Sequence, residues 1–295
     1  MAANDNELMQ YVLSKVKENE GVLVPVKASL LERALVRKVR INKLHPNPDD
    51  EFCFPNIGPS YRIIENYVRA FTQFNTATAG LTDDPLQVEK VHPYGYMILN
   101  GHHRWAAARK VGRKKIKVEI VNLTQETDIE KMIKASNHDK RVTLDLDEVV
   151  FCLSPDDPPE KQLGFPFNRI YKEKIRYGIP ALLHFLAKQG YDVWVYSANY
   201  YSLDYIKNYF KHYSVKMDGI ITGTGRKMKD SKDAREKLEK MMNNKYKETI
   251  HIDRNMVLRT IRDTGDFEEK EIVAEPLEWS RETINIIKKM CPAEN

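Results

Sequence analysis

The second half of the chain alternates between short apolar runs and amphipathic runs, and this alternation constrains the fold more than any other feature. Runs of strand length are expected at 141–146, 191–196, 218–221, 248–252 and 271–274. Runs with helical periodicity follow most of them, at 180–189, 201–213, 230–243 and 279–290. Strands that alternate with helices form a mostly parallel sheet covered on both faces. The sequence therefore predicts an α/β domain with a doubly wound sheet.

The first half has a different rhythm, with more helix and shorter strands. Helices are expected at 5–18, 28–37, 60–72, 101–109 and 125–136. Strands are expected at 39–41, at 116–121, and as a pair within 86–99 around the turn His92–Gly95. A polar stretch, Ser136–Lys140, separates the two halves. We therefore predict an α+β domain over residues 1–138 and the doubly wound domain over residues 139–295.

Composition excludes several classes of protein. The sequence has no apolar run of the length that a membrane-spanning helix needs, and its N-terminus lacks the pattern of a secretory signal. Three cysteines, far apart in the sequence, argue against a disulfide framework and a cysteine-based zinc site. The net charge of +5 is compatible with anionic ligands but far from that of a dedicated nucleic-acid binder. We expect a cytoplasmic protein without a membrane partner.

Two carboxylates follow the first apolar strand of the second half. Asp145 and Asp147 are separated by one residue at the end of the run Arg141–Leu144. Ligands of open α/β sheets bind at the carboxyl ends of the strands, so both side chains are expected to face one site. Two clustered carboxylates repel each other unless a cation lies between them, and Mg²⁺ prefers oxygen ligands. The pattern predicts a magnesium site that handles phosphate.

The strand followed by Asp-x-Asp resembles the first motif of the haloacid dehalogenase-like (HAD) phosphohydrolases, and the resemblance continues in order over about 140–290. Ser197 ends the next strand, a lysine follows the third, and Asp253 ends the fourth. The resemblance implies a Rossmannoid sheet without a large cap. It implies that Asp145 is the nucleophile and Asp147 the general acid/base. The phosphate would be held by Ser197 and Lys229, with Lys227 and Lys232 left open, and Mg²⁺ by Asp145, Asp147 and Asp253.

The sequence also departs from that pattern. Arg254 and Asn255 follow Asp253, where the family often has a second acid. The segment between Asp147 and the next helix is long enough for a hairpin flap only, so the site is expected to be open to a bulky or macromolecular substrate. The lysine-rich stretch 226–247 also contains acids, which favours a solvated amphipathic helix over an electropositive wall.

A second candidate site lies in the first half, where a strand, Tyr96–Leu99, runs through Asn100 and Gly101 into a helix. Free N–H groups at a helix start attract anions, and glycine lets a phosphate approach the backbone. Arg104 can hold phosphate oxygens in a bidentate manner. His102 and His103 can donate to phosphate or act as an acid/base. The segment predicts a phosphate site.

This signature resembles the ParB/sulfiredoxin superfamily, and the resemblance covers about 36–135. It implies that Gly101, His102, His103 and Arg104 bind a nucleoside triphosphate or diphosphate such as ATP, ADP or CTP. The double histidine is closest to free serine kinases, which place a carboxylate base near the turn after the first strand. Asp49 and Asp50 fall there too, but Glu51 is the preferred base. Whether this domain is a kinase or only binds nucleotide is left open.

Together the motifs predict a two-domain phosphotransfer enzyme, a Mg²⁺-dependent phosphatase joined to a nucleotide-binding domain that can also be a kinase. Its partners would be a nucleotide and a phosphorylated substrate, either a small molecule or a nucleic-acid end. Two alternatives remain. One is a kinase/phosphatase, phage-encoded or not, that processes nucleic-acid ends or modifies DNA bases. The other is a nucleotide-gated regulator that binds DNA and uses the second domain as a scaffold without catalysis.

Overall fold

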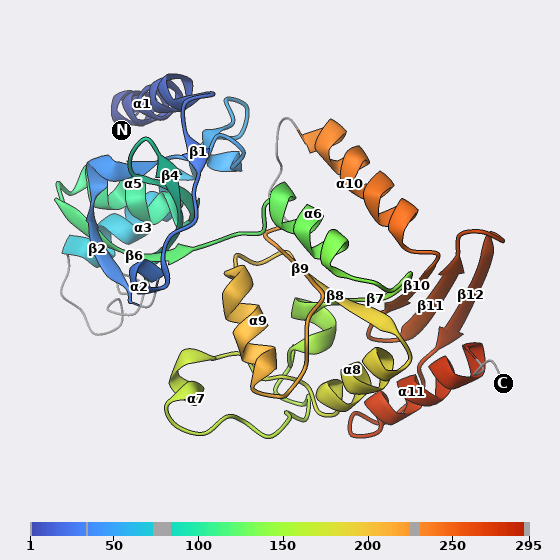
Figure 1. Cartoon of the computed structure of the whole chain (residues 1–295). Helices are drawn as coiled ribbons and strands as arrows, with labels where there is room; N and C mark the ends of the chain where they lie inside the picture. Colours follow the sequence, from blue (N-terminus) through green and yellow to red (C-terminus); the bar gives the residue numbers. More distant parts are fainter. Residues whose placement is uncertain (1, 34, 73–83, 225–230, 292–295) are drawn as a thin grey trace. The chain divides into compact units, whose positions relative to one another are not determined.

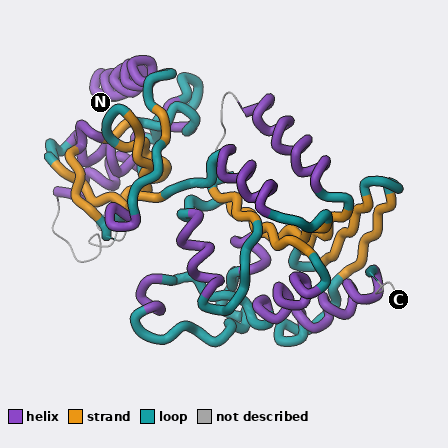
Figure 2. Tube along the Cα trace, in the orientation of Figure 1, coloured by secondary structure: helices purple, strands orange, loops and turns teal. Residues whose placement is uncertain are grey.

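The computed structural model describes residues 2–33, 35–72, 84–224 and 231–291. The chain divides into two compact units, one ending at Asn122 and the other beginning at Leu123. Each unit has its own sheet and helices (Figures 1 and 2). Among the described residues, no helix combines the length and the apolar character that a membrane crossing requires.

The first unit is built on a mixed sheet with strand order β2-β6-β4-β5-β3, and β1 pairs with β4. The pairs β3·β5 and β4·β6 are parallel, whereas the other pairs are antiparallel. Its strands are β1 (Val24–Pro25), β2 (Arg37–Arg40), β3 (Leu44–His45), β4 (Leu86–His92), β5 (Tyr96–Asn100) and β6 (Lys115–Val121). Its helices are α1 (Ala2–Asn19), α2 (Leu30–Arg33), α3 (Tyr61–Thr72), α5 (His102–Lys110) and the short η1 (Ile41–Lys43) and η2 (Glu51–Cys53).

Apolar side chains from the sheet and helices form one core in this unit. Trp105, on α5, is 1% exposed and lies among Phe52, Ile64 and the β4 residues Leu86 and Val88. The alanines that follow Trp105 on the same helix are also buried. These small side chains allow α5 to approach its neighbours closely. Close packing fixes the position of α5 directly after the Gly101 turn.

The expected helix over 28–37 is wrong for most of its length. Among the described residues of this stretch, only the single turn α2 (Leu30–Arg33) is helical, and β2 begins at Arg37. Leu30, Leu31 and Leu35 are exposed rather than buried, so the apolar periodicity that suggested a helix has no core to pack on. Most of the stability of a protein helix comes from such packing.

The second unit contains a six-stranded sheet with order β12-β11-β10-β7-β8-β9. The four strands from β10 to β9 are parallel, as expected. Its strands are β7 (Lys140–Asp145), β8 (Tyr191–Ser197), β9 (Gly219–Thr222), β10 (Glu248–Ile252), β11 (Met256–Ile261) and β12 (Asp266–Glu271). Its helices are α6 (Glu126–Ala135), η3 (Leu146–Val150, a single π-helical turn), α7 (Phe167–Ile170), α8 (Ile179–Lys188), α9 (Leu203–Lys211), α10 (Ser231–Lys245) and α11 (Trp279–Met290).

The expected strand at 271–274 is wrong, and a hairpin takes its place. β10 and β11 pair antiparallel, as do β11 and β12, so the sheet is mixed rather than wholly parallel. All six residues of β12 are exposed. A solvated strand with four acids and one lysine carries no apolar alternation, which is why pattern analysis did not find it.

Helices cover both faces of the second sheet (Figure 1). The larger core packs α8, α9 and α11 against one face, with Leu144 and Val195 buried at its centre. On the other face, α6 and α10 pack over Trp194. Because α6 packs on β9 and α10, it groups with the second unit, although the sequence places the domain boundary after it.

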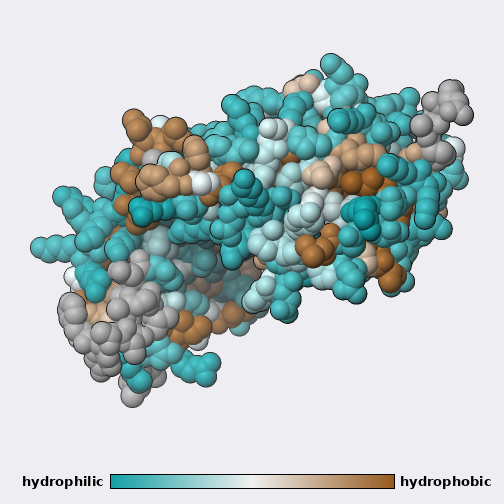
Figure 3. Space-filling view, turned by 90° about the horizontal axis from the view of Figure 1, so that it is seen from below, coloured by the Kyte–Doolittle hydropathy of each residue, from teal (hydrophilic) through white to brown (hydrophobic). Residues whose placement is uncertain are grey.

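The surface in Figure 3 is mostly hydrophilic, with separate apolar patches. Large exposed apolar residues are found in both units, among them Leu31 and Phe165. Scattered apolar residues on a surface are ordinary and mark no site by themselves.

Candidate functional site

The first candidate site lies at the carboxyl edge of the parallel strands. Strand pairing places Asp145 level with Tyr196, and Ser197 level with Thr222. Leu144 is level with Ile252, so Asp253 follows β10 at the same edge at which Asp145 ends β7. The topology therefore brings the predicted acids and Ser197 to neighbouring strand ends.

The Asp145 carboxylate is fixed by the backbone that follows it. Its Oδ1 accepts hydrogen bonds from the N–H of Asp147 at 2.7 Å and of Glu148 at 2.9 Å. These donors are the first N–H groups of the turn η3, so Asp145 caps it. The half-buried side chain has no described donor on Oδ2. One oxygen is thus held in place while the other remains available.

The Asp147 carboxylate is held by the next strand end. Its Oδ2 accepts from Ser197 Oγ at 2.8 Å, from Ala198 N at 3.0 Å and from Asn199 N at 3.4 Å. Its Oδ1 is buried and has no hydrogen-bond partner among the described residues. A buried carboxylate oxygen without a partner is costly unless a ligand or cation meets it. The side chain of Ser197 is itself fully buried and positions Asp147.

Asp253 and Arg254 connect the fourth strand end to the segment after η3. Asp253 Oδ1 accepts from the N–H of Arg254 at 2.6 Å. The Arg254 guanidinium forms an ion pair with Asp157, 6% exposed, at 2.5 Å and donates to the carbonyl of Glu148 at 3.5 Å. Arg254 occupies a position at which the HAD family often has a second acid. Its ion pair with Asp157 anchors the loop over 151–160.

The loop after η3 has only two isolated bridges and α7. Phe151 bridges to Ile175, and Pro159 bridges to Arg176. Near this loop, Tyr201 contacts Phe151 and stacks on Tyr205, and both tyrosines pack against the larger core, as the sequence predicted. Burial raises the pKa of Tyr201, and the charges of Glu173 and Asp147 raise it further, which places this phenol close to the site.

Lys227 and Lys229 lie outside the described residues, and nothing is described of the Lys232 side chain. Over the described ranges, no three or more His, Cys, Asp and Glu side chains cluster in a way that could hold a metal ion.

The second candidate site is the turn between β5 and α5. Gly101 adopts φ 100°, in the left-handed region, and a Cβ there would lie 2.4 Å from Leu86 Cδ2. Only glycine fits both requirements. The turn leaves the N–H groups at the start of α5 directed away from the helix, as an anion site needs.

The two histidines of the signature hold the loop that follows β3. His102 Nε2 accepts from the N–H of Asn47 at 3.1 Å, and His103 Nε2 accepts from the N–H of Ser60 at 3.0 Å. Both rings also contact Phe52. Since each Nε2 accepts a hydrogen bond from a backbone N–H, both rings anchor the loop.

The carboxylate next to the histidines is Asp50 rather than Glu51. Asp50 Oδ2 lies 3.4 Å from His102 Nδ1, and its Oδ1 accepts from Phe52 N at 2.9 Å. Glu51 is exposed in η2. The one-residue difference arises because Asp50 is the N-cap of that turn and so points back towards α5, which a sequence pattern does not specify.

Arg104 is oriented along β4. Its Nη1 donates to the carbonyls of Asp84 and Pro85, the latter at 3.2 Å. Its guanidinium carbon lies 5.5 Å from the centre of the Tyr67 ring. The buried Nε has no partner among the described residues. The Arg104 side chain therefore lies near the turn, but its hydrogen bonds to the backbone just before β4 fix the direction of its guanidinium group.

Acidification is expected to destabilise the first unit through His102. Complete burial lowers the pKa of His102 to about 4, against the opposing pull of Asp50, and burial also lowers the pKa of His103. The unfolded chain takes up this proton near pH 6.5, so stability is lost as pH falls from 6.5 towards 4. We expect a loss of about 2 kcal/mol for His102 between pH 7.5 and 5.

This loss is measured as the free energy of unfolding at each pH, from guanidinium denaturation and from hydrogen exchange at Trp105 and its neighbours. The His102→Gln variant, whose amide oxygen can accept from Asn47 N–H, should lose most of the pH dependence. An unfolding free energy that is unchanged down to pH 5 in the wild type would contradict the assignment.

The comparisons with known proteins concern the part that contains the Gly101 turn. Residues 63–137 match the ParB N-terminal domain. This ParB-like region begins within α3 and runs through α6, and it includes the whole strand–glycine–helix unit. No curated protein matches the sequence.

Solved structures that resemble the chain include two kinds of protein. A C-terminally truncated ParB from Caulobacter crescentus complexed with CTP-gamma-S has 20% identity and a TM-score of 0.25, over 36% of this chain and 56% of that one. The same protein complexed to the centromeric parS site has 24% identity and a TM-score of 0.23, over 35% and 51%. This chain thus spans about half the length of these ParB structures.

A free serine kinase in complex with AMP has 14% identity and a TM-score of 0.22, over 84% of this chain and 94% of that one. At such scores, the alignments carry no argument about the activity of this chain. The similar structures are thus a ParB complexed with CTP-gamma-S and a free serine kinase, and the family match is confined to residues 63–137.

Proposed function

We propose that the chain is a two-domain phosphotransfer enzyme whose second domain, 139–295, is a HAD-type phosphatase. The single observation that carries this proposal is the meeting of Asp145, Asp147 and Ser197 at two neighbouring parallel strand ends, with Asp147 held by Ser197 at 2.8 Å. The order of the parallel strands places Asp253 at the next strand end on the other side.

Each residue of this site then has one role. Asp145 Oδ2, free of described donors, attacks the phosphorus, and the bond between phosphorus and the leaving oxygen breaks. Asp147 gives a proton to that oxygen. Water then attacks the aspartyl-phosphate, Asp147 takes the proton back, and inorganic phosphate leaves. The hydrogen bonds to Asp145 Oδ1 keep the nucleophile from rotating away.

The proposed cofactor is Mg²⁺, and in the described ranges no cluster of three side-chain ligands is found. The set that the proposal requires has two carboxylates, Asp145 and Asp253, and the main-chain carbonyl of Asp147. The free oxygen of Asp145 and the unpartnered buried Oδ1 of Asp147 mark a place where a cation lowers the energy. When bound, Mg²⁺ offsets the repulsion between the carboxylates and the phosphate. Lys229, with Lys227 and Lys232 as alternatives, is proposed to hold phosphate oxygens.

The first domain, 1–138, is proposed to bind a nucleotide at Gly101, His102, His103 and Arg104. Support comes from the family match, which includes the whole turn, and from the glycine that no other residue can replace. ATP, ADP and CTP are the nucleotides to test. For a kinase reaction, Asp50 is better placed than Glu51 to act near the histidines. The match runs to residue 137 and so includes α6, which the compact units assign to the second unit beginning at Leu123.

Two assays on the full chain test the proposal. Hydrolysis of p-nitrophenyl phosphate should require added Mg²⁺ and fall to background with EDTA. Calorimetric titration with ATP, ADP and CTP should detect binding that Arg104→Ala weakens about tenfold. The exposed Arg62→Ala on α3 provides a matched control. Magnesium-independent hydrolysis would exclude the phosphatase mechanism, and absence of binding to any nucleotide would exclude the role of the first domain.

Removing the Ser197 hydroxyl should lower turnover without ending it. Ser197→Ala deletes one of three donors to Asp147 Oδ2 and leaves the two backbone N–H groups. Loss of a hydrogen bond to a charged group costs about 1.5–3 kcal/mol, so kcat should fall roughly 10- to 100-fold. Ser136→Ala, before β7 at the opposite edge of the sheet, should leave kcat unchanged. An effect on KM alone would show that Ser197 binds substrate instead of positioning Asp147.

A further inference from the structure

Arg176, which lies just before α8, is an arginine buried inside the second unit. The residue is only 3% exposed. Its Nε and Nη2 are buried, and neither has a hydrogen-bond partner among the described residues. Over the same ranges, no carboxylate forms an ion pair with it. A guanidinium in this state is costly, because its charge is neither hydrated nor compensated.

The acid nearest to Arg176 is already committed to other donors. Asp157 Oδ1 pairs with Arg254 at 2.5 Å, and its Oδ2 accepts from the N–H groups of Leu153 at 2.8 Å and Ser154 at 3.0 Å. Burial and the nearby charge of Arg254 lower the pKa of Arg176 to about 10, against the opposing effect of Asp157. The guanidinium is therefore still charged at neutral pH. Two cations thus share one carboxylate, which leaves a positive charge without a partner.

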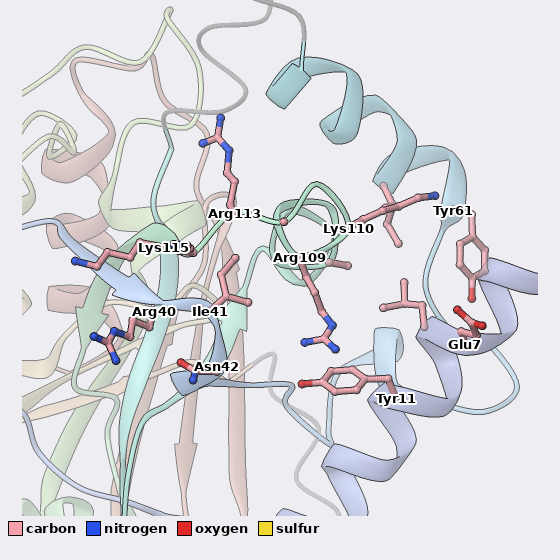
Figure 4. Close-up of a pocket in the computed structure, with 15 residues that line it drawn as sticks. Glu7, Tyr11, Arg40, Ile41, Asn42, Tyr61, Arg109, Lys110, Arg113 and Lys115 are labelled. Carbon is pink, nitrogen blue, oxygen red and sulfur yellow. The ribbon is translucent and has the colours of Figure 1, made fainter.

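Contact with an aromatic ring does not replace the missing partner. The guanidinium carbon of Arg176 lies 3.6 Å from the centre of the Trp279 ring, and that of Arg109 lies at the same distance from Tyr11. Arg109 is exposed and lines a cavity of about 870 Å³ in the first unit, so water reaches its N–H groups (Figure 4). A ring face attracts the charge but leaves the N–H groups without an acceptor. Arg176 has the ring contact without the water.

The two unpartnered nitrogens indicate which group would fit. Nε and Nη2 lie on one edge of the planar guanidinium, and their N–H bonds run parallel. This edge binds two oxygens of a single carboxylate or phosphate group. A buried water molecule can accept from the N–H groups, but it leaves the charge uncompensated. The Arg176 edge therefore fits an oxyanion better than it fits water.

We propose that Arg176 and Arg254 together bind a phosphate group. Arg176 holds two phosphate oxygens through Nε and Nη2, and Arg254 holds a third. The Arg254 side chain is 33% exposed, so the phosphate enters from its side, and this side chain shifts to uncover the Arg176 edge. The Arg254 guanidinium also donates to the carbonyl of Glu148, the residue after Asp147. The phosphate group therefore lies beside the proposed phosphatase site, and it is either free inorganic phosphate or a second phosphate of the substrate.

Thermal unfolding of the full chain in EDTA tests the binding of inorganic phosphate. Without a cation, the carboxylates of Asp145, Asp147 and Asp253 repel phosphate, so the proposed phosphatase site does not contribute. Phosphate at about 20 mM should raise the unfolding midpoint of the second unit by about 3–6 °C over chloride at the same ionic strength. A dissociation constant of about 2 mM gives a shift of this size.

Three variants assign the shift to Arg176. Arg176→Met removes the buried charge and should abolish the rise. Arg176→Lys keeps the charge but lacks the edge with two parallel donors, so less than half of the rise should remain. Arg169→Met is the matched control, because Arg169 is an exposed arginine of the same unit whose guanidinium carbon lies 5.2 Å from the centre of the Phe165 ring. Its rise should equal that of the wild type.

Hydrolysis assays distinguish the two sources of the phosphate group, and this comparison alone rests on the proposed function. If the source is the substrate, KM for adenosine 3′,5′-bisphosphate should be about tenfold below KM for adenosine 5′-monophosphate in the wild type, and the two should be equal in Arg176→Met. Equal values in the wild type, together with the thermal shift, assign the site to free phosphate.

The proposal is overturned if phosphate raises the midpoint of Arg176→Met or Arg176→Lys as much as that of the wild type. It is equally overturned if the wild type shows no rise over chloride and no difference in KM. Absence of hydrolysis of either nucleotide would count against the phosphatase and not against this site, because the measurement in EDTA requires no turnover.

Discussion

Asp145→Asn is expected to reduce hydrolysis of p-nitrophenyl phosphate by a factor on the order of 10³ to 10⁶, as loss of a nucleophile does in other enzymes. The amide oxygen can still accept the N–H groups of Asp147 and Glu148, so the turn η3 keeps its cap. What is lost is the negative charge of Oδ2 and its nucleophilicity. Steady-state phosphate release measures the change.

The matched control is Asp156→Asn. This exposed carboxylate lies in the loop after η3, only a few residues beyond the site in sequence, and its change removes the same charge. We expect its turnover to stay within twofold of the wild type. Nucleotide titration of Asp145→Asn should be unaltered, because the Gly101 turn is in the other unit. Retained hydrolysis in Asp145→Asn would remove the nucleophile from the mechanism.

Gly219→Ala is expected to destabilise the second unit by about 3 kcal/mol or more. A Cβ at this position would lie 1.9 Å from the indole of Trp194, which is fully buried. The indole cannot move away easily, because its N–H donates to Tyr246 Oη at 2.9 Å and that hydroxyl donates to Asp192 at 2.8 Å. Thermal unfolding should begin about 6–12 °C lower.

Two further variants make this prediction specific. Gly164→Ala is the control, because a Cβ there meets nothing within 4 Å and its φ is ordinary. A double-mutant cycle with Trp194→Leu should show that alanine at 219 costs less once the indole is gone. If alanine at 219 costs the same in both backgrounds, the strain does not come from Trp194.

The helices and the parallel strands were predictable where their packing follows a regular period. α11 (Trp279–Met290) coincides with the expected range, since its apolar stripe packs on a core. The hairpin β11–β12 was not predictable, because a solvated strand needs no apolar alternation. The 28–37 region failed for the opposite reason: it has apolar periodicity but no surface to pack on.

The site was predictable as a set of residues but not as a set of contacts. The order of strand ends brought Asp145, Asp147 and Ser197 together, as the spacing suggested. That Ser197 would be buried behind Asp147 depends on the loop after β8, which no motif encodes. That Asp50 rather than Glu51 lies beside His102 depends on the three-residue turn η2, whose N-cap is Asp50.

The exposed strand β12 has a consequence for association between molecules. It is the last strand of its sheet, so its outer N–H and C=O groups are open to any other strand. Its sequence places Asp266, Glu268, Glu269 and Glu271 within six residues. Two copies of such a strand repel each other, which keeps the sheets of different molecules from joining edge to edge. The same acids that make this strand hard to recognise in the sequence thus disfavour strand pairing at this edge.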